Sequence, residues 1–199
     1  MDTIAKWTNK MNNSLQKFNK LVEAFESLPT IGKKSATRLS YHIVMKDSFL
    51  GAKLSHAIED AIGHIKECSV CGGMSEDELC FICSDDRRDN SILCIVENAK
   101  DILLLEENAL FEGKYFVLEE LNEQNILKLQ KTVSFGVKEI LFALTPSIAN
   151  DAVMLYIEDK LSDFSINYTK IAQGVPTGVS LENIDLLSLT RALRDRVKV

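Results

Sequence analysis

Four cysteines at metal-ligand spacing are the residues best suited to chemistry in this chain of 199 residues. Cys68-x2-Cys71 and Cys80-x2-Cys83 form two pairs that are separated by eight residues. Four thiolates at this spacing can bind one tetrahedral Zn²⁺, and such a site is structural because it leaves no open position. Disulfides are disfavoured because the sequence shows no secretory signal. We expect one structural Zn²⁺ per chain, holding a segment with little apolar core.

Two further side chains near this set are expected to stay outside it. Cys94 lies in the apolar run 92–96, where a buried core thiol is the simplest interpretation. His64 precedes Cys68 by four residues, but four thiolates already complete a tetrahedral site.

A short basic turn at residues 28–36 is the second feature with chemical potential. Gly32 lets the backbone turn closely into the following helix, whose first N–H groups and dipole favour an anion. Lys33, Lys34 and Arg38 lie in its first two turns, where cations are locally unfavourable unless a phosphate sits among them. The pattern is typical of a helix-hairpin-helix that grips a nucleic-acid backbone. An ordinary helical turn with a solvated basic face is an equal alternative.

Carboxylates are the third group to consider. Glu97 directly follows the apolar run 92–96, and Asp151 is the only acidic residue just after the run 139–143. Strand ends are where α/β folds place functional side chains, but two isolated carboxylates make a poor two-metal site for Mg²⁺. Acidic pairs elsewhere, such as 106–107, are expected to lie on solvated faces.

The elements that must position these residues follow from hydrophobic periodicity. The first part is helical, with predicted helices over 13–28, around 36–44 and over 52–66. After the cysteines, strands alternate with helices, which indicates an α/β fold with a mostly parallel sheet flanked by helices. The predicted strands cover 92–96, 115–118, 139–143 and 167–172, and the predicted helices cover 99–107, 122–133, 150–161 and 184–194.

Charge is distributed unevenly along the chain. The net charge is −6, but it is +4 over residues 1–66 and −10 over residues 67–199. Phosphate binding needs Lys and Arg, so the basic first part, rather than the acidic total, fits a DNA partner. The hydrophobic share of 46% excludes general disorder, and no apolar run is long enough to span a bilayer. We expect a cytoplasmic, nucleoid-associated protein with no membrane partner.

The motifs, taken in order, resemble the RecR family of bacterial recombination-repair proteins. The resemblance covers nearly the whole chain from about residue 15. It rests on LPxIGxKSAxRL at 28–39, the four cysteines, RD at 88–89, VE at 96–97, GxYxVL at 113–118, GxPxG at 174–178 and LExxD at 181–185.

The resemblance implies four parts: a helix-hairpin-helix over 1–66, a zinc finger over 67–84, a Toprim-like domain over 85–172 and a C-terminal wrapping segment over 173–199. It implies a non-enzymatic DNA clamp that works with RecO and RecF to load RecA onto gapped single-stranded DNA coated by the single-strand binding protein. Homodimers or ring tetramers are implied as well. Lys34 and Arg38 match DNA-binding positions of the family, and Glu97 matches a Toprim glutamate in a region linked to RecO.

Three departures from the family pattern bear on these expectations. Thr30 stands where the family usually has Gly, and Glu119-Glu120 replaces a Gly pair. Ala149 and Asp151 fall where the family shows two glutamates, which weakens the case for Mg²⁺ and leaves Glu97 and Asp151 as partner-binding candidates.

Two other functions are open on the residues alone. One is a Toprim-type metal-dependent nuclease or primase that acts on DNA through Glu97 and Asp151. The other is an interaction scaffold in which the hairpin only dimerises, with helix 13–28 as the dimer surface.

Overall fold

The structure is a computed structural model that describes residues 14–107 and 111–171. The chain divides into two compact units, Met1–His64 and Ile65–Val199. The helix expected over 184–194 and the segment 173–199 lie outside the described residues.

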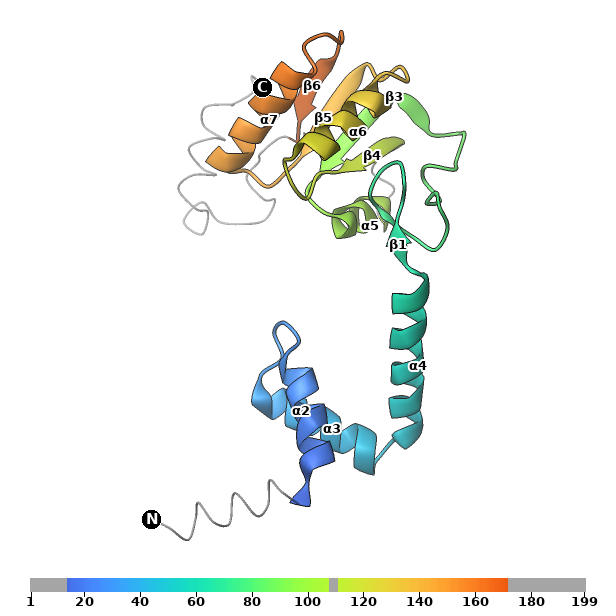
Figure 1. Cartoon of the computed structure of the whole chain (residues 1–199), viewed down its shortest axis with the longest axis vertical. Helices are drawn as coiled ribbons and strands as arrows, with labels where there is room; N and C mark the ends of the chain where they lie inside the picture. Colours follow the sequence, from blue (N-terminus) through green and yellow to red (C-terminus); the bar gives the residue numbers. More distant parts are fainter. Residues whose placement is uncertain (1–13, 108–110, 172–199) are drawn as a thin grey trace, which may run out of the picture. The chain divides into compact units, whose positions relative to one another are not determined.

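The first unit contains three helices: α2 (Gln16–Glu26), α3 (Lys33–Met45) and α4 (Ser48–His64), shown in Figure 1. α3 contacts both other helices. A Cβ added at Gly51 would lie 2.5 Å from the Ile43 Cγ2 atom, so glycine permits the close approach of α4 to α3. α4 begins four residues before its predicted start because the Asp47 carboxylate accepts the Leu50 N–H (2.9 Å) at the helix start.

The turn between α2 and α3 corrects the role expected of Gly32. Gly32 has an ordinary extended backbone with φ −86°, and a Cβ there would meet no heavy atom within 4 Å. Thr30 instead takes the left-handed conformation, with φ 68°. This is costly for a β-branched residue, so the strain lies at the position where the resemblance expects glycine.

The second unit is built on a parallel sheet of four strands in the order β4-β3-β5-β6. Over the described residues the expected alternation of strands and helices is confirmed. The strands are β3 (Asp89–Val96), β4 (Gly113–Val117), β5 (Glu139–Ala143) and β6 (Asn167–Lys170), and the helices are α5 (Ala99–Glu107), α6 (Glu123–Val133) and α7 (Ile148–Lys160). Helix α5 and strand β5 have the predicted bounds, and the bounds of the other elements differ by a few residues.

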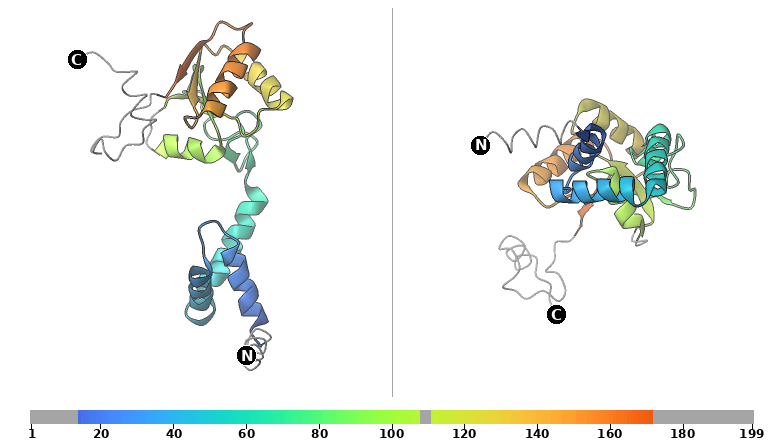
Figure 2. Two further views of the ribbon diagram at one scale, coloured as in Figure 1. Left: turned by 90° about the vertical axis from the view of Figure 1, so that its left-hand side faces the viewer. Right: turned by 90° about the horizontal axis from the view of Figure 1, so that it is seen from below.

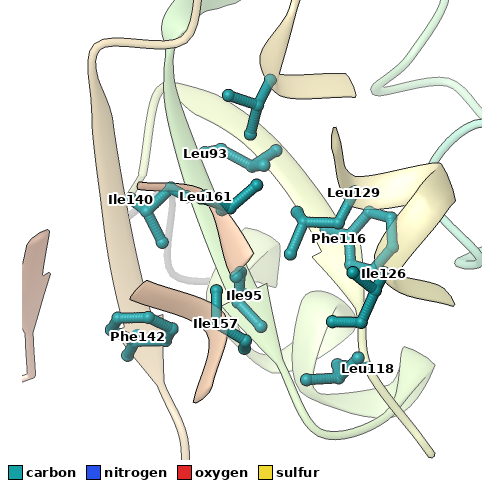
Figure 3. Packing of buried hydrophobic residues seen from close by; sticks show 11 residues of the cluster. Leu93, Ile95, Phe116, Leu118, Ile126, Leu129, Ile140, Phe142, Ile157 and Leu161 are labelled. Carbon is teal, nitrogen blue, oxygen red and sulfur yellow. The ribbon is translucent and has the colours of Figure 1, made fainter. Parts of the chain in front are cut away.

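The two faces of the sheet carry different cores, because successive side chains of a strand point to opposite faces. On β3, Leu93 and Ile95 pack with residues of α6 and α7, including Leu129 and Ile157 (Figure 3). Cys94 and Val96 belong to the other core, with α5 and the cysteine quartet. Figure 2 (left) shows α5 on the opposite side of the sheet from α6 and α7.

The cysteine segment forms a small hairpin that was not predicted. β1 (Lys66–Glu67) pairs antiparallel with β2 (Met74–Ser75). Lys66, which the periodicity assigned to a helix, therefore lies in a strand, since α4 ends at His64. Among the described residues, no helix is both long and apolar enough to cross a membrane.

Replacing Thr30 by Gly should stabilise the first unit. Glycine adopts positive φ without strain, so we expect a gain of about 0.5–1 kcal/mol in the free energy of unfolding after the extra entropy of the unfolded chain is included. Urea unfolding followed by circular dichroism measures it. The opposite substitution, Gly72→Ala, puts a side chain at a φ of 76° and should lower the free energy of unfolding. A Thr30→Gly variant no more stable than the parent would contradict this account of the turn.

Candidate metal centre and basic helix start

The four cysteines predicted as ligands come together in one cluster. Their Sγ atoms all lie within 4.8 Å of one another, and the Cys71 and Cys80 sulfurs are 3.6 Å apart. A tetrahedral zinc ion with Zn–S bonds of about 2.3 Å requires sulfur separations of about 3.8 Å. The donor set and its spacing therefore fit one Zn²⁺, which would cross-link the two CxxC turns.

Backbone N–H groups point at three of the sulfurs. Gly73 donates to the Cys71 Sγ (3.3 Å), Cys80 to the Cys68 Sγ (3.3 Å) and Cys83 to the Cys80 Sγ (3.4 Å). Gly72 makes the turn possible with φ 76°, where a Cβ would lie 3.3 Å from the Val117 Cβ. Such bonds stabilise thiolates, which are the form that binds a metal.

The acidities of these thiols are linked through their contacts. The hydrogen bond from Cys83 lowers the pKa of Cys71 to about 6, and the same bond raises the pKa of Cys83. Burial raises the pKa of Cys80. Four thiolates together therefore need a bound cation, because ionising one sulfur opposes the ionisation of its neighbours.

Lys114 on β4 attaches the cysteine segment to the sheet, and the sequence reasoning missed it. Its ammonium group donates to the carbonyls of Ile82 (2.7 Å), Cys83 (3.3 Å) and Asp85 (2.9 Å). The only signal in the sequence is a lone cation directly before the predicted strand 115–118. On the same strand, the Val117 N–H donates to the Cys71 carbonyl (2.8 Å).

A nearly buried ion pair between Arg88 and Glu106 corrects the expectation that Glu106 lies on a solvated face. The Glu106 carboxylate accepts from the Arg88 guanidinium and from the Tyr115 hydroxyl (2.8 Å). The side chains of Arg88 and Glu106 are only 16% and 15% exposed. Glu106 is thus not on a solvated face. The hydrogen bond from Arg88 lowers its pKa.

The two side chains expected to stay outside the metal set do so. Cys94 is buried in the sheet, and desolvation raises the pKa of its thiol to about 12, which disfavours the thiolate form that binds a metal. His64 lies on α4 with its Nδ1 atom 2.8 Å from the Asp60 carbonyl oxygen and 3.1 Å from the Asp60 Oδ1.

Glu97 and Asp151 have separate partners at the carboxyl end of the sheet. Glu97 accepts from the Thr145 N–H (3.1 Å), the Thr145 hydroxyl (2.7 Å) and the Asn150 amide. The bond from the Thr145 hydroxyl is the main cause of its lowered pKa. The carboxylate of Asp151 faces the Lys170 ammonium at 3.7 Å. Within residues 14–107 and 111–171, the cysteine quartet is the only group of three or more candidate metal ligands.

The basic start of α3 has the predicted arrangement of charges. Lys33, Lys34 and Arg38 are all exposed, and the first turn holds no acidic residue. The helix is preceded by Gly32, which has no side chain to cap it. Its first N–H groups therefore have no side-chain cap, and three cations lie in the first two turns around them. This arrangement is suited to an anionic ligand.

Two family models match this chain. Residues 18–62, which cover most of the three helices, match the model of the RecR helix-hairpin-helix. Residues 65–85 match the model of the RecR zinc finger domain with four cysteine ligands. Fold and site thus define a protein of the helix-hairpin-helix class that carries a four-cysteine zinc finger domain beside a parallel α/β sheet.

Curated relatives extend the match to nearly the whole chain. The recombination protein RecR of a Nitratiruptor species is 56% identical over 190 residues, which is 95% of this chain and 100% of that protein. The recombination protein RecR of Helicobacter pylori is 47% identical over 191 residues, or 96% of this chain and 99% of its own. The chain belongs to the RecR family, and the resemblance in the motifs is confirmed.

Loss of one cysteine ligand should abolish zinc binding. We expect wild-type protein to hold one zinc per chain and Cys80→Ser to hold almost none after dialysis against a chelator, because three thiolates bind zinc far less tightly. The metal is measured by atomic absorption. Cys94→Ala, which removes the cysteine outside the cluster, is the matched control and should keep its zinc. Zinc retained by Cys80→Ser would contradict the assigned ligand set.

Glu106→Gln should lower the free energy of unfolding by about 2–3 kcal/mol, because it leaves the Arg88 charge nearly buried without its partner. The pKa of Glu106 is lowered in the folded state, so its contribution is complete above about pH 5 and is lost as pH falls through that lowered value. Between pH 7 and pH 3, the free energy of unfolding measured with denaturant should therefore fall less in the Glu106→Gln variant than in wild type. Glu107→Gln, its exposed neighbour, should match wild type; equal stability of both variants would count against the pair.

Proposed function

We propose that this chain is a DNA-binding recombination protein that acts as a clamp and mediator without catalysing a reaction. The observation that carries the proposal is the start of α3, where Lys33, Lys34 and Arg38 are exposed around an uncapped helix terminus. The curated relatives named recombination protein RecR, at 47–56% identity, support the same role.

The contact proposed at α3 is with the phosphate backbone. Free N–H groups after Gly32 and the cations of Lys34 and Arg38 can hold successive phosphates, which positions DNA without reading its sequence. Because this attraction releases counterions, binding should weaken steeply with salt. The net charge of −10 over residues 67–199 would oppose unspecific adhesion elsewhere on the chain.

The remaining parts of the chain are assigned supporting roles. We divide it into a DNA-binding and dimerising part (1–66), a zinc finger (67–84), a Toprim-like domain (85–172) and a C-terminal segment (173–199). One structural Zn²⁺ bound by the cysteine quartet would hold the finger against β4, where Lys114 already attaches it.

Partner proteins are proposed to bind at the carboxyl end of the sheet. Glu97 is kept ionised and oriented by Thr145 and Asn150, and Asp151 is about half exposed beside Lys170. We assign this edge to RecO and RecF, with which the protein would load RecA onto gapped DNA covered by the single-strand binding protein.

Self-association, as a dimer or a ring tetramer, is supported by α4. This helix has no buried residue, and Leu54, Ile58 and Ile62 recur at helical spacing with 39%, 56% and 78% exposure. An apolar stripe of this kind is typical of a helix that packs against another chain. It is a stronger candidate than α2, where Val22 is buried and Phe18, Leu21 and Phe25 are partly buried.

A metal-dependent nuclease or primase is less well supported. Such a reaction needs carboxylates that converge on Mg²⁺, whereas Glu97 is occupied by neutral donors and Asp151 by Lys170. Within the described part of the chain, no third carboxylate joins them in a ligand cluster.

Charge reversal at α3 tests the proposal. The double variant Lys34→Glu, Arg38→Glu should bind gapped DNA at least about tenfold more weakly, and its binding should fall less steeply with salt, by about 1 in log–log slope per lost contact. Fluorescence anisotropy over a salt series measures both quantities.

The control is Lys131→Glu, Lys160→Glu, which makes the same change in net charge on α6 and α7 and should leave binding near wild type. Light scattering first establishes that each variant keeps the assembly of the parent, which we expect to exceed a monomer. Unchanged binding by the α3 variant would refute the proposed function.

A further inference from the structure

The solvent face of α3 carries more than charge. Lys34, Arg38, Tyr41 and Met45 lie within about 60° of arc, at about 100° per residue, and form one stripe along the helix. The buried residues Ala36 and Ser40 lie on the opposite side. The stripe therefore faces solvent over about 16 Å of helix length.

Tyr41 is an unusual member of this stripe because it is a large aromatic residue beside cations. Its side chain is 49% exposed, and Met45, one turn further on, is 63% exposed. Arg38 lies one turn before it, and the Lys46 ammonium lies 6.0 Å from the centre of its ring. The ring thus offers a flat apolar face within a positively charged surface.

We propose that Tyr41 is a stacking platform for an unpaired DNA base, while Lys34 and Arg38 hold the neighbouring phosphates. This inference rests on the proposed DNA-binding function and names its preferred ligand, a single-stranded segment. Single-strand binding proteins combine basic grooves with aromatic rings in this way, and the stacking tolerates any base sequence. Paired bases in a duplex do not expose their faces, so Tyr41 contributes only where the DNA is single-stranded.

Charge complementarity favours DNA over a second copy of the chain as the occupant. A two-fold contact through this stripe would enclose Lys34 and Arg38 of both copies in one interface, and α3 holds no carboxylate that could pair with them. A polyanion instead pairs with the cations and covers the apolar ring. The stripe is also separate from the exposed apolar residues of α4, such as Ile58 and Ile62.

The test compares Tyr41→Leu with Tyr41→Phe in the full-length protein. Leucine keeps apolar bulk but not the flat ring, so its affinity for an oligonucleotide of thymines should fall about 5- to 100-fold at fixed salt. Tyr41→Phe should keep wild-type affinity. Affinity for a blunt duplex should be unchanged in both variants, and the salt slope should stay that of wild type because no phosphate contact is lost.

A base analogue supplies the second readout. Single-stranded DNA containing 2-aminopurine should lose fluorescence on binding wild type or Tyr41→Phe, as the base stacks on the ring, and keep it with Tyr41→Leu. Equal loss of single-strand and duplex affinity in Tyr41→Leu, no loss at all, or a smaller assembly by light scattering would overturn the inference. If the double variant Lys34→Glu, Arg38→Glu bound DNA like wild type, the proposed DNA-binding function itself would be rejected. Failure of the stacking inference and failure of the proposed function therefore give different results.

Discussion

The crowding of four cysteine sulfurs within 4.8 Å of one another is the constraint on which the second unit depends. Hydrogen bonding makes Cys71 more acidic only by making Cys83 less so, and the set cannot ionise fully without a cation. Apart from the cysteines, Ile82 is the one large apolar side chain that segment 65–85 buries. Metal ligation therefore takes the place of a core there, as is common in segments too small to bury enough apolar surface.

The sheet connects this metal-dependent segment to an ordinary hydrocarbon core. Leu93 and Ile95 face the core beneath α6 and α7, whereas Cys94 and Val96 face the cysteine quartet. One strand, β3, thus contributes to both layers, and Glu97 follows it directly. Order at the metal site and the position of Glu97 are consequently set by the same backbone.

Local features of the structure could be predicted well from the sequence. Helix α5 and strand β5 have the predicted bounds, because each contains one short uninterrupted apolar run, 102–105 and 140–143, that begins next to a charged residue. The cysteine ligands were found because CxxC spacing encodes a metal site directly. The exposed cations at the start of α3 were likewise visible in the sequence, since they depend only on helical spacing.

The features that could not be predicted from the sequence depend on contacts between residues that are distant along the chain. Glu106 has the pattern of an exposed helix position, and only its pairing with Arg88, 18 residues away, makes it part of the interior. Lys114 reaches carbonyls about 30 residues earlier in the chain. Thr30 departs from the glycine of the family pattern, but its positive φ is a property of the turn between α2 and α3 that its residue type does not indicate. No propensity of a single segment carries such information.

The hydrogen bond from the Val117 N–H to the Cys71 carbonyl places the cysteine turn against β4. β4 is an outer strand of the sheet, and unpaired backbone groups along such a strand are a template on which other chains can add. The cysteine turn covers part of that template. Because bound zinc would hold this turn in place, the metal site would also shield part of the outer strand from pairing with other chains.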